Sequence, residues 1–200
     1  MVKKDFRLKA AKIFLLLLII FLFCPGSKNS LPHIYAEEDL NGNGIKEEYF
    51  LSNHTLSVKE ADKEIWKTPQ NYYVDSFSLG DINHDGNMNL VISLWKKGSF
   101  GELKPFWHTE KDEDYKNHLF VYQMQDSTFK SVWCSSNLDR PILFFEIKDQ
   151  DEDGLNELIV EEGVYKKMIG NYYTPNTNGT TRTAVWKWDE WGFSLQRILK

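Results

Sequence analysis

The chain has 200 residues, 26% of them charged, and a formal net charge of −5 at pH 7. This acidic balance argues against nucleic-acid binding, which needs clustered Lys and Arg. Of the two cysteines, Cys24 lies in an N-terminal segment that we expect to be removed, so Cys134 would remain alone and an intramolecular disulfide is excluded.

Residues 1–24 have the composition of an export signal. Basic residues between positions 3 and 12 precede twelve apolar residues, 13–24, which is typical of a secretory signal. As a helix the apolar part would span about 18 Å, short of the ~30 Å hydrocarbon core of a bilayer. We therefore expect a cleaved signal peptide, with a retained membrane anchor as the alternative, and a linker over 25–33. A lipid-attached Cys24 is a third alternative, although Phe23 stands where such signals want a small residue. Each of these places the domain outside the cell or on its surface.

Three copies of one acidic pattern follow. Each has Asp at position 1, Asp or Asn at positions 3 and 5, Gly at position 6, and Glu or Asn at position 9. The copies begin at Asp39, Asp81 and Asp149. Alternate oxygen-bearing side chains on a tight turn suit a hard cation such as Ca²⁺, and Gly permits the turn.

The residues around each pattern argue against an EF-hand. Position 12 is Phe50, Ile92 or Val160, whereas an EF-hand has a bidentate Glu there, followed by a helix. Positions 10–12 instead open apolar, β-prone runs, and similar runs precede each loop. Each loop therefore joins two predicted strands.

The acidic pattern is part of a larger unit that occurs three times. Each unit reads as strand, acidic loop, strand, connection, strand, polar turn and strand. Four antiparallel strands in this order make one blade of a β-propeller, so we expect an all-β fold of three such blades. The units cover about 34–70, 71–137 and 140–200, and inserts at the same topological point run over 96–117 and 165–183.

The second unit, over residues 77–92, resembles an FG-GAP/VCBS-type repeat, the calcium-loop blade of integrin α-subunit heads and many bacterial surface proteins. The resemblance covers about 34–200. It implies a β-propeller whose loops hold up to three structural Ca²⁺ ions through the side chains at positions 1, 3, 5 and 9 and the carbonyl at position 7. The side-chain ligands so implied are Asp39, Asn41, Asn43 and Glu47, then Asp81, Asn83, Asp85 and Asn89, then Asp149, Asp151, Asp153 and Glu157; the carbonyls are those of Ile45, Asn87 and Leu155.

The three units depart from that family in specific ways. Glu38 and Lys148 replace the Gly that usually precedes position 1, and Asn89 is neutral where an acid is usual. The first loop has two acids among its four side-chain ligands and the third has four. Since anionic ligands tighten Ca²⁺ binding, we expect the third site to be the strongest and the first the weakest, such that it could stay empty. The alternative for each loop is a plain Asn/Asp/Gly turn.

Three blades are too few to close a propeller, which has about four to eight. The sequence leaves open a homodimer that completes a ring, an incomplete arc with capped ends, and an N-terminal strand that swaps into the last unit.

No catalytic constellation is recognised in the sequence, and an enzyme is not expected. We expect His108 and His118 to be solvated loop residues of the first insert, because no third zinc ligand is suitably spaced. Cys134 should be a small buried hydrophobic residue.

Aromatic residues in the two inserts are candidates for a ligand-binding surface, because rings offer large contact areas at low entropic cost. These are Phe106, Trp107, Tyr115, Tyr172 and Tyr173. Alternatively, they fold back and cover the blade edges.

The sequence therefore predicts an exported, Ca²⁺-binding, β-propeller-like module that binds a protein or glycan at the cell surface and contacts membrane only through its N-terminal segment. The competing hypotheses are an extracellular enzyme that acts on polysaccharide and a purely structural subunit of a surface complex.

Overall fold

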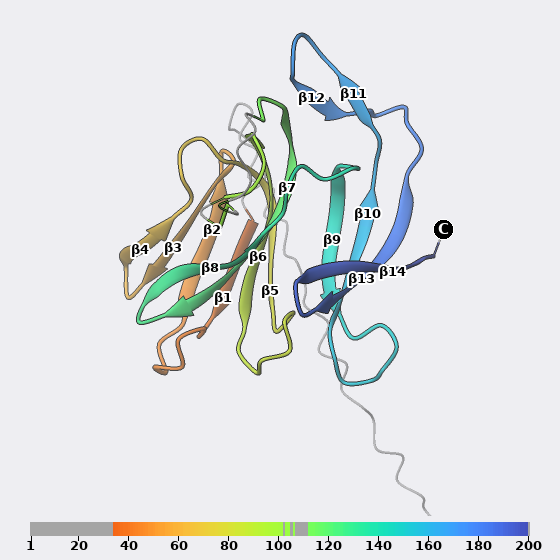
Figure 1. Cartoon of the computed structure of the whole chain (residues 1–200). Helices are drawn as coiled ribbons and strands as arrows, with labels where there is room; N and C mark the ends of the chain where they lie inside the picture. Colours follow the sequence, from red (N-terminus) through yellow and green to blue (C-terminus); the bar gives the residue numbers. More distant parts are fainter. Residues whose placement is uncertain (1–33, 102, 105, 107–111, 200) are drawn as a thin grey trace, which may run out of the picture. The chain divides into compact units, whose positions relative to one another are not determined.

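The computed structural model describes residues 34–101, 103–104, 106 and 112–199 (Figure 1), which belong to the compact unit formed by residues 31–200. The predicted signal or anchor (1–24), the linker (25–33), His108 and Trp107 lie outside the described residues. The described part contains fourteen strands and no helix, so the predicted all-β class is confirmed. It accordingly contains no helix of the length and apolar character needed to cross a membrane.

The first sheet is a simple antiparallel meander in the order β1-β2-β3-β4. Its strands are β1 (Ile34–Glu38), β2 (Glu47–Ser52), β3 (Thr55–Glu60) and β4 (Lys63–Lys67). Two-residue turns with positive φ, at Asn53-His54 and Ala61-Asp62, join the last three strands, as the right-handed twist of hairpins favours. Apolar residues alternate with polar ones, and Tyr49, Leu51 and Val58 are buried.

The second sheet has the same antiparallel order, β5-β6-β7-β8. Its strands are β5 (Tyr73–Gly80), β6 (Asn89–Lys97), β7 (Tyr115–Gln125) and β8 (Thr128–Cys134). All residues of β6 except the last are buried. A strand that is buried on both faces does not need to alternate apolar and polar residues, which explains the continuous apolar run over residues 90–92.

The third sheet has the order β9-β10-β13-β14 and carries a separate two-stranded hairpin. Its strands are β9 (Ile142–Lys148), β10 (Glu157–Glu162), β13 (Arg182–Asp189) and β14 (Gly192–Ile198), and the hairpin consists of β11 (Tyr165–Lys167) and β12 (Tyr173–Pro175). The predicted four-stranded antiparallel sheets are thus confirmed. Among the described strands none pairs across from one sheet to another, so the three sheets do not make a closed barrel or ring.

Two hydrophobic cores lie on either side of the second sheet. Leu90, Ile92 and Leu94 of β6 pack into one core with residues of the first sheet. Val91, between them, packs into the other core with residues of the third sheet. Because successive side chains of a strand point to opposite faces, the second sheet is the layer that the two cores share.

The first insert is shorter than predicted. β6 continues through Lys97 and β7 begins at Tyr115, so the connection between them is 98–114 rather than 96–117. The polar residue Lys96 is buried inside the strand, because its ammonium group donates to the carbonyl oxygens of Gly98 and, at 2.7 Å, Phe100. The second insert, over 165–183, contains the β11–β12 hairpin.

Candidate cation-binding loops

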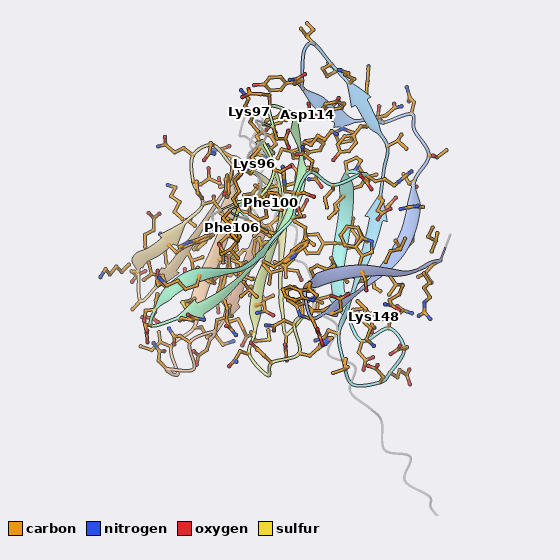
Figure 2. The ribbon with its side chains drawn as sticks, in the orientation of Figure 1. Lys96, Lys97, Phe100, Phe106, Asp114 and Lys148 are labelled. Atoms are coloured by element: carbon orange, nitrogen blue, oxygen red, sulfur yellow. The ribbon has the colours of Figure 1, made fainter. Side chains whose placement is uncertain are left out.

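The three acidic loops occupy equivalent places, each joining the first and second strands of its sheet. They connect β1 to β2, β5 to β6 and β9 to β10, at the lower ends of these strands in Figure 1. In Figure 2, Lys148 marks the start of the third loop, while Lys97 and Asp114 lie at the far end of their strands, where the first insert begins and ends. The loops and the inserts therefore lie at opposite ends of the sheets.

The Asp at position 1 fixes the turn in the same way in every loop. One of its carboxylate oxygens accepts the backbone N–H of the Gly at position 6, over 2.8–2.9 Å, and this Gly has φ between +85° and +88°. The pairs are Gly44 with Asp39, Gly86 with Asp81, and Gly154 with Asp149. Because such a φ is accessible to Gly but strained for other residues, the motif's Gly is required by the backbone.

The side chain at position 9 closes each loop from the second strand. Glu47, Asn89 and Glu157 are all almost fully buried. Each accepts the backbone N–H of position 2, over 2.7–3.0 Å; these donors are Leu40, Ile82 and Gln150.

The second polar atom of each position-9 side chain takes no part in this backbone hydrogen bond. Among the described residues, no hydrogen bond of ordinary length reaches Glu47 Oε1 or Asn89 Nδ2, although the buried Tyr49 hydroxyl lies near the Glu47 carboxylate, and Glu157 Oε1 has an ionic contact with Lys187. Buried polar atoms nearly always have partners, and an exception calls for an explanation such as an ion. The two carboxylate oxygens are suitable cation ligands, whereas Asn89 presents a donor.

Negative charge accumulates at the first loop. Burial raises the pKa of Glu47, and the nearby carboxylates of Asp39 and Glu60 raise it further, against the lowering effect of the hydrogen bond from Leu40. Three carboxylates therefore lie close enough to repel one another, and a bound cation would relieve that repulsion.

The second loop contains more unpaired oxygen atoms. Asp81 Oδ1 and Asn83 Oδ1 are buried and accept no hydrogen bond from any residue in the described ranges. They belong to positions 1 and 3, two of the predicted ligand positions. The loop is also fastened to the third one, because Asn156 donates to Asp81 O over 2.8 Å and His84 Nε2 lies 2.8 Å from Asn156 O.

The third loop brings three carboxylates together. Oxygen atoms of Asp149, Asp151 and Asp153 all lie within 4.8 Å of one another. Such a group could hold a metal ion, although nothing in its geometry is specific to Ca²⁺.

Three residues of the third strands also reach these loops, and sequence reasoning missed them. Glu60 of β3, Gln123 of β7 and Lys187 of β13 each contact the side chain at position 5. Glu60 and Gln123 pair in register with the position-9 residues Glu47 and Asn89. The turns between strands set that register, so counting back from the turns could have placed Glu60 opposite Glu47.

The predicted ligand-binding aromatics divide into two places. Tyr115 stacks on Tyr172 with ring centroids 5.0 Å apart. Tyr173 packs edge-to-face against Tyr165. The start of β7, where the first insert ends, thus meets the second insert, with a backbone hydrogen bond from Tyr115 N to Asn171 O. Phe106 is exposed and lies apart from the hairpin (Figure 2).

A cavity of about 300 Å³ between the second and third sheets had no signal in the sequence. Its wall includes a buried carboxylate, Glu162, which pairs with the guanidinium groups of Arg140 and Arg182 and accepts Trp186 Nε1–H over 3.1 Å. Within the described residues this carboxylate is used by its own neighbours, so we assign it a structural role.

The expectation of a solvated His118 is wrong. His118 is fully buried in β7, with Nδ1 3.4 Å from Ser135 O. Burial, assisted by the positive charge of Lys96, lowers the pKa of His118 to about 4. Its sequence neighbours Lys116 and Asn117 look like loop residues, but Asn117 is itself buried with hydrogen bonds. Cys134 is buried, as expected.

The described residues contain no recognised catalytic constellation, and the protein is not assigned as an enzyme. Comparisons with family models, curated proteins and solved structures find no match for this chain. The resemblance to FG-GAP/VCBS repeats therefore stays a prediction from the residues quoted above.

Proposed function

We propose that this chain is an exported module of three propeller-type blades of the FG-GAP/VCBS kind, in which Ca²⁺ binds the three acidic loops and acts structurally. In this proposal the module binds a protein or a glycan at the cell surface through its insert-bearing end. The observation that supports cation binding best is the position-9 side chain: it is buried and held by one backbone hydrogen bond, and its second oxygen accepts no backbone N–H of the described residues in the first and third loops, where in the third it faces the Lys187 ammonium group.

The donor chemistry of the loops fits a hard cation. The residues present are carboxylates and side-chain amides, which are the ligands that Ca²⁺ prefers, in flexible sets of six to eight oxygens. Ca²⁺ would neutralise the clustered carboxylates and tie together the two strands that each loop connects. The chain's own contribution is to hold the loop in shape through the Asp–Gly and position-9 hydrogen bonds.

The proposed recognition surface rests on the contact between the start of β7 and the second insert. Tyr172 is exposed at the β11–β12 hairpin, as are the neighbouring Met168 and Ile169. The ring of Tyr115 stacks on the ring of Tyr172. Lys116 lies over the Tyr173 ring, 4.6 Å from its centroid. A rigid aromatic group with a nearby cation suits either a sugar face or an aromatic or acidic side chain of a partner.

Calorimetric titration of the full chain with Ca²⁺ tests the cation part of the proposal. We expect saturable binding that is abolished when the position-1 acids are neutralised together, in Asp39→Asn/Asp81→Asn/Asp149→Asn. The matched control neutralises three acids of other turns, in Asp62→Asn/Asp126→Asn/Asp189→Asn, and should bind like the wild type. Equal binding by the two triple variants, or none by the wild type, would refute the proposal.

Recognition is tested separately with arrays of glycans and of surface proteins. Tyr172→Ala should lose the bound ligand, while Trp191→Ala, which changes a still more exposed aromatic on the β13–β14 turn, should keep it. Binding that survives Tyr172→Ala would show that the recognition surface lies elsewhere.

A further inference from the structure

Each acidic loop is touched by one side chain from the third strand of its sheet. Glu60 Oε1 accepts hydrogen bonds from Asn43 Nδ2, over 2.8 Å, and from Asn41 Nδ2, over 2.7 Å. Gln123 Nε2 donates to Asp85 Oδ2 over 2.8 Å. The third strand thus adds a further polar group at the same place in all three sheets.

Lys187 is the corresponding side chain of the third sheet. Its ammonium nitrogen lies 2.8 Å from Asp153 Oδ2 and 3.3 Å from Glu157 Oε1. These carboxylates stand at positions 5 and 9, so the ammonium group contacts two of the four predicted side-chain ligands.

The third-strand residues differ in charge from sheet to sheet. The first and second loops each have two acids among their four ligand side chains, with the anionic Glu60 and the neutral Gln123 beside them, whereas the third, with four acids, has the cationic Lys187. Counting only the loop residues therefore overstates the difference between the first and third sites.

We propose that the third-strand residue sets the cation affinity of each loop: Glu60 is an additional anionic ligand of the first loop, and Lys187 is a tethered ammonium that competes with the cation in the third. This inference rests on the cation binding proposed above and reverses the order expected from the sequence. The first loop fills at a lower Ca²⁺ concentration than the third, because a cation must displace Lys187 from Asp153 and Glu157.

The buried position-9 carboxylates support cation binding at these loops independently of the number of acids. Glu47 and Glu157 are almost fully buried, and each keeps one oxygen atom that accepts no hydrogen bond from a backbone N–H of the residues described. Glu157 Oε1 is the oxygen that Lys187 faces. The ammonium group therefore stands where a cation would find its buried ligand.

The loops can be followed one by one in the full chain labelled with ¹⁵N-glycine. Gly44, Gly86 and Gly154 each donate to the position-1 Asp of their own loop, so their amide resonances report the filling of the three loops separately. Ca²⁺ is the titrant, and the midpoint of each resonance shift is measured. In the wild type we expect Gly44 to shift at lower Ca²⁺ than Gly154.

Removing the third-strand charge should change one midpoint only. Lys187→Met should lower the Gly154 midpoint by about tenfold or more, because the ammonium group no longer opposes the divalent ion at close range. Lys187→Arg keeps the positive charge and should keep the midpoint high. Glu60→Gln should raise the Gly44 midpoint by about tenfold. The controls Lys67→Met and Glu64→Gln make the same charge changes on exposed positions of β4 that do not face Glu60 in the β3–β4 register, and they should change neither midpoint.

The outcomes separate this inference from the function on which it rests. If none of the three glycines shifts with Ca²⁺ in any variant, cation binding itself fails. If they shift in the wild type but Lys187→Met and Glu60→Gln leave the midpoints unchanged, or Gly154 shifts before Gly44 in the wild type, cation binding stands and the role of the third strand is wrong. If Lys187→Met unfolds the third loop at every Ca²⁺ concentration, Lys187 is a structural ion-pair partner and the inference is overturned.

Discussion

At the scale of single residues, position 9 of the loops shows how one substitution changes the chemistry while the backbone stays the same. Glu47, Asn89 and Glu157 make the same hydrogen bond to the second residue of their loops. In each glutamate the second carboxylate oxygen is not used in this hydrogen bond. In Asn89 the second polar atom is the amide nitrogen, a donor that repels a cation. The three loops therefore share a fold but differ in what they can bind.

His118 is the residue whose environment makes stability depend on pH. It is buried in β7 with Lys96 and Asp112 as its charged neighbours, and its pKa is lowered to about 4 from 6.5. A depressed His pKa means that the unfolded chain binds the extra proton between pH 6.5 and 4. The contribution of His118 to the free energy of unfolding is then greatest above pH 6.5, falls as the pH decreases through this window, and is lost below pH 4.

We expect His118 to contribute a loss of about 3 kcal/mol across that window, at about 1.4 kcal/mol per pKa unit. The measurement is urea unfolding at several pH values for the wild type and for His118→Phe, because the difference between the two cancels the carboxylates that titrate in the same range. A wild-type curve that is parallel to that of His118→Phe from pH 6.5 to 4 would show that His118 is not responsible.

At the scale of elements, the strands were largely predictable because each has a period of two or a short apolar run bounded by turn residues. The runs around Phe77 and Leu143 in the sequence correspond to β5 and β9, and the acidic loops joined strands, as predicted. The ends of β6 and β7 were missed because Lys96 and Asn117 are polar residues whose hydrogen bonds are made inside the fold. No local pattern reports such bonds.

The third-strand contacts were missed for a related reason. Position 5 of a loop meets Glu60, Gln123 or Lys187 only after the sheet has formed. The position-1 and position-6 pairing, in contrast, is local, so the motif itself predicts it. The loop geometry of the candidate site could therefore be predicted from the motif. The contacts that the third strand of each sheet makes with the loop could not.

Asn117 is the residue that most clearly connects elements. Its Nδ2 donates to Ser93 Oγ and to Leu94 O of β6, and its Oδ1 accepts the N–H of Ile142, the first residue of β9, over 2.9 Å. One buried amide thus joins the second sheet to the start of the third. Without it, the amide of Ile142 would be buried with no acceptor.

Asn117→Ala should lower the free energy of unfolding by about 2–4 kcal/mol, the cost of several buried hydrogen bonds and a stranded donor. Urea unfolding at a fixed Ca²⁺ concentration measures it. Asn178→Ala, at an exposed position of the second insert, should change the value by less than about 0.5 kcal/mol. A similarly small effect of Asn117→Ala would mean that the contact between β7 and β9 does not depend on this side chain.

At the scale of the whole unit formed by residues 31–200, the second sheet is common to both hydrophobic cores. Neither outer sheet can lose its core without exposing a face of β6 and β7. A further tie joins the second and third loops through Asn156 and His84. We therefore expect the three sheets to unfold together in one transition, so that a cation bound at any loop stabilises all of them.

We accordingly expect the protein to unfold in one thermal transition, and removal of Ca²⁺ should lower its melting temperature. A ligand at a hundred times its Kd adds about 2.7 kcal/mol to the free energy of unfolding, and for a unit of this size each kcal/mol is worth about 2–4 °C. Each filled loop should then raise Tm by roughly 5–10 °C between EDTA and saturating Ca²⁺, as measured by calorimetry of the full chain. Mg²⁺ should raise it less, because Mg²⁺ gives up its hydration water reluctantly and demands near-ideal octahedral geometry. The same Tm in EDTA and in Ca²⁺ would contradict a structural role for the ion. Two transitions, of which only one responds to Ca²⁺, would show that the second sheet does not couple the unfolding of the other two.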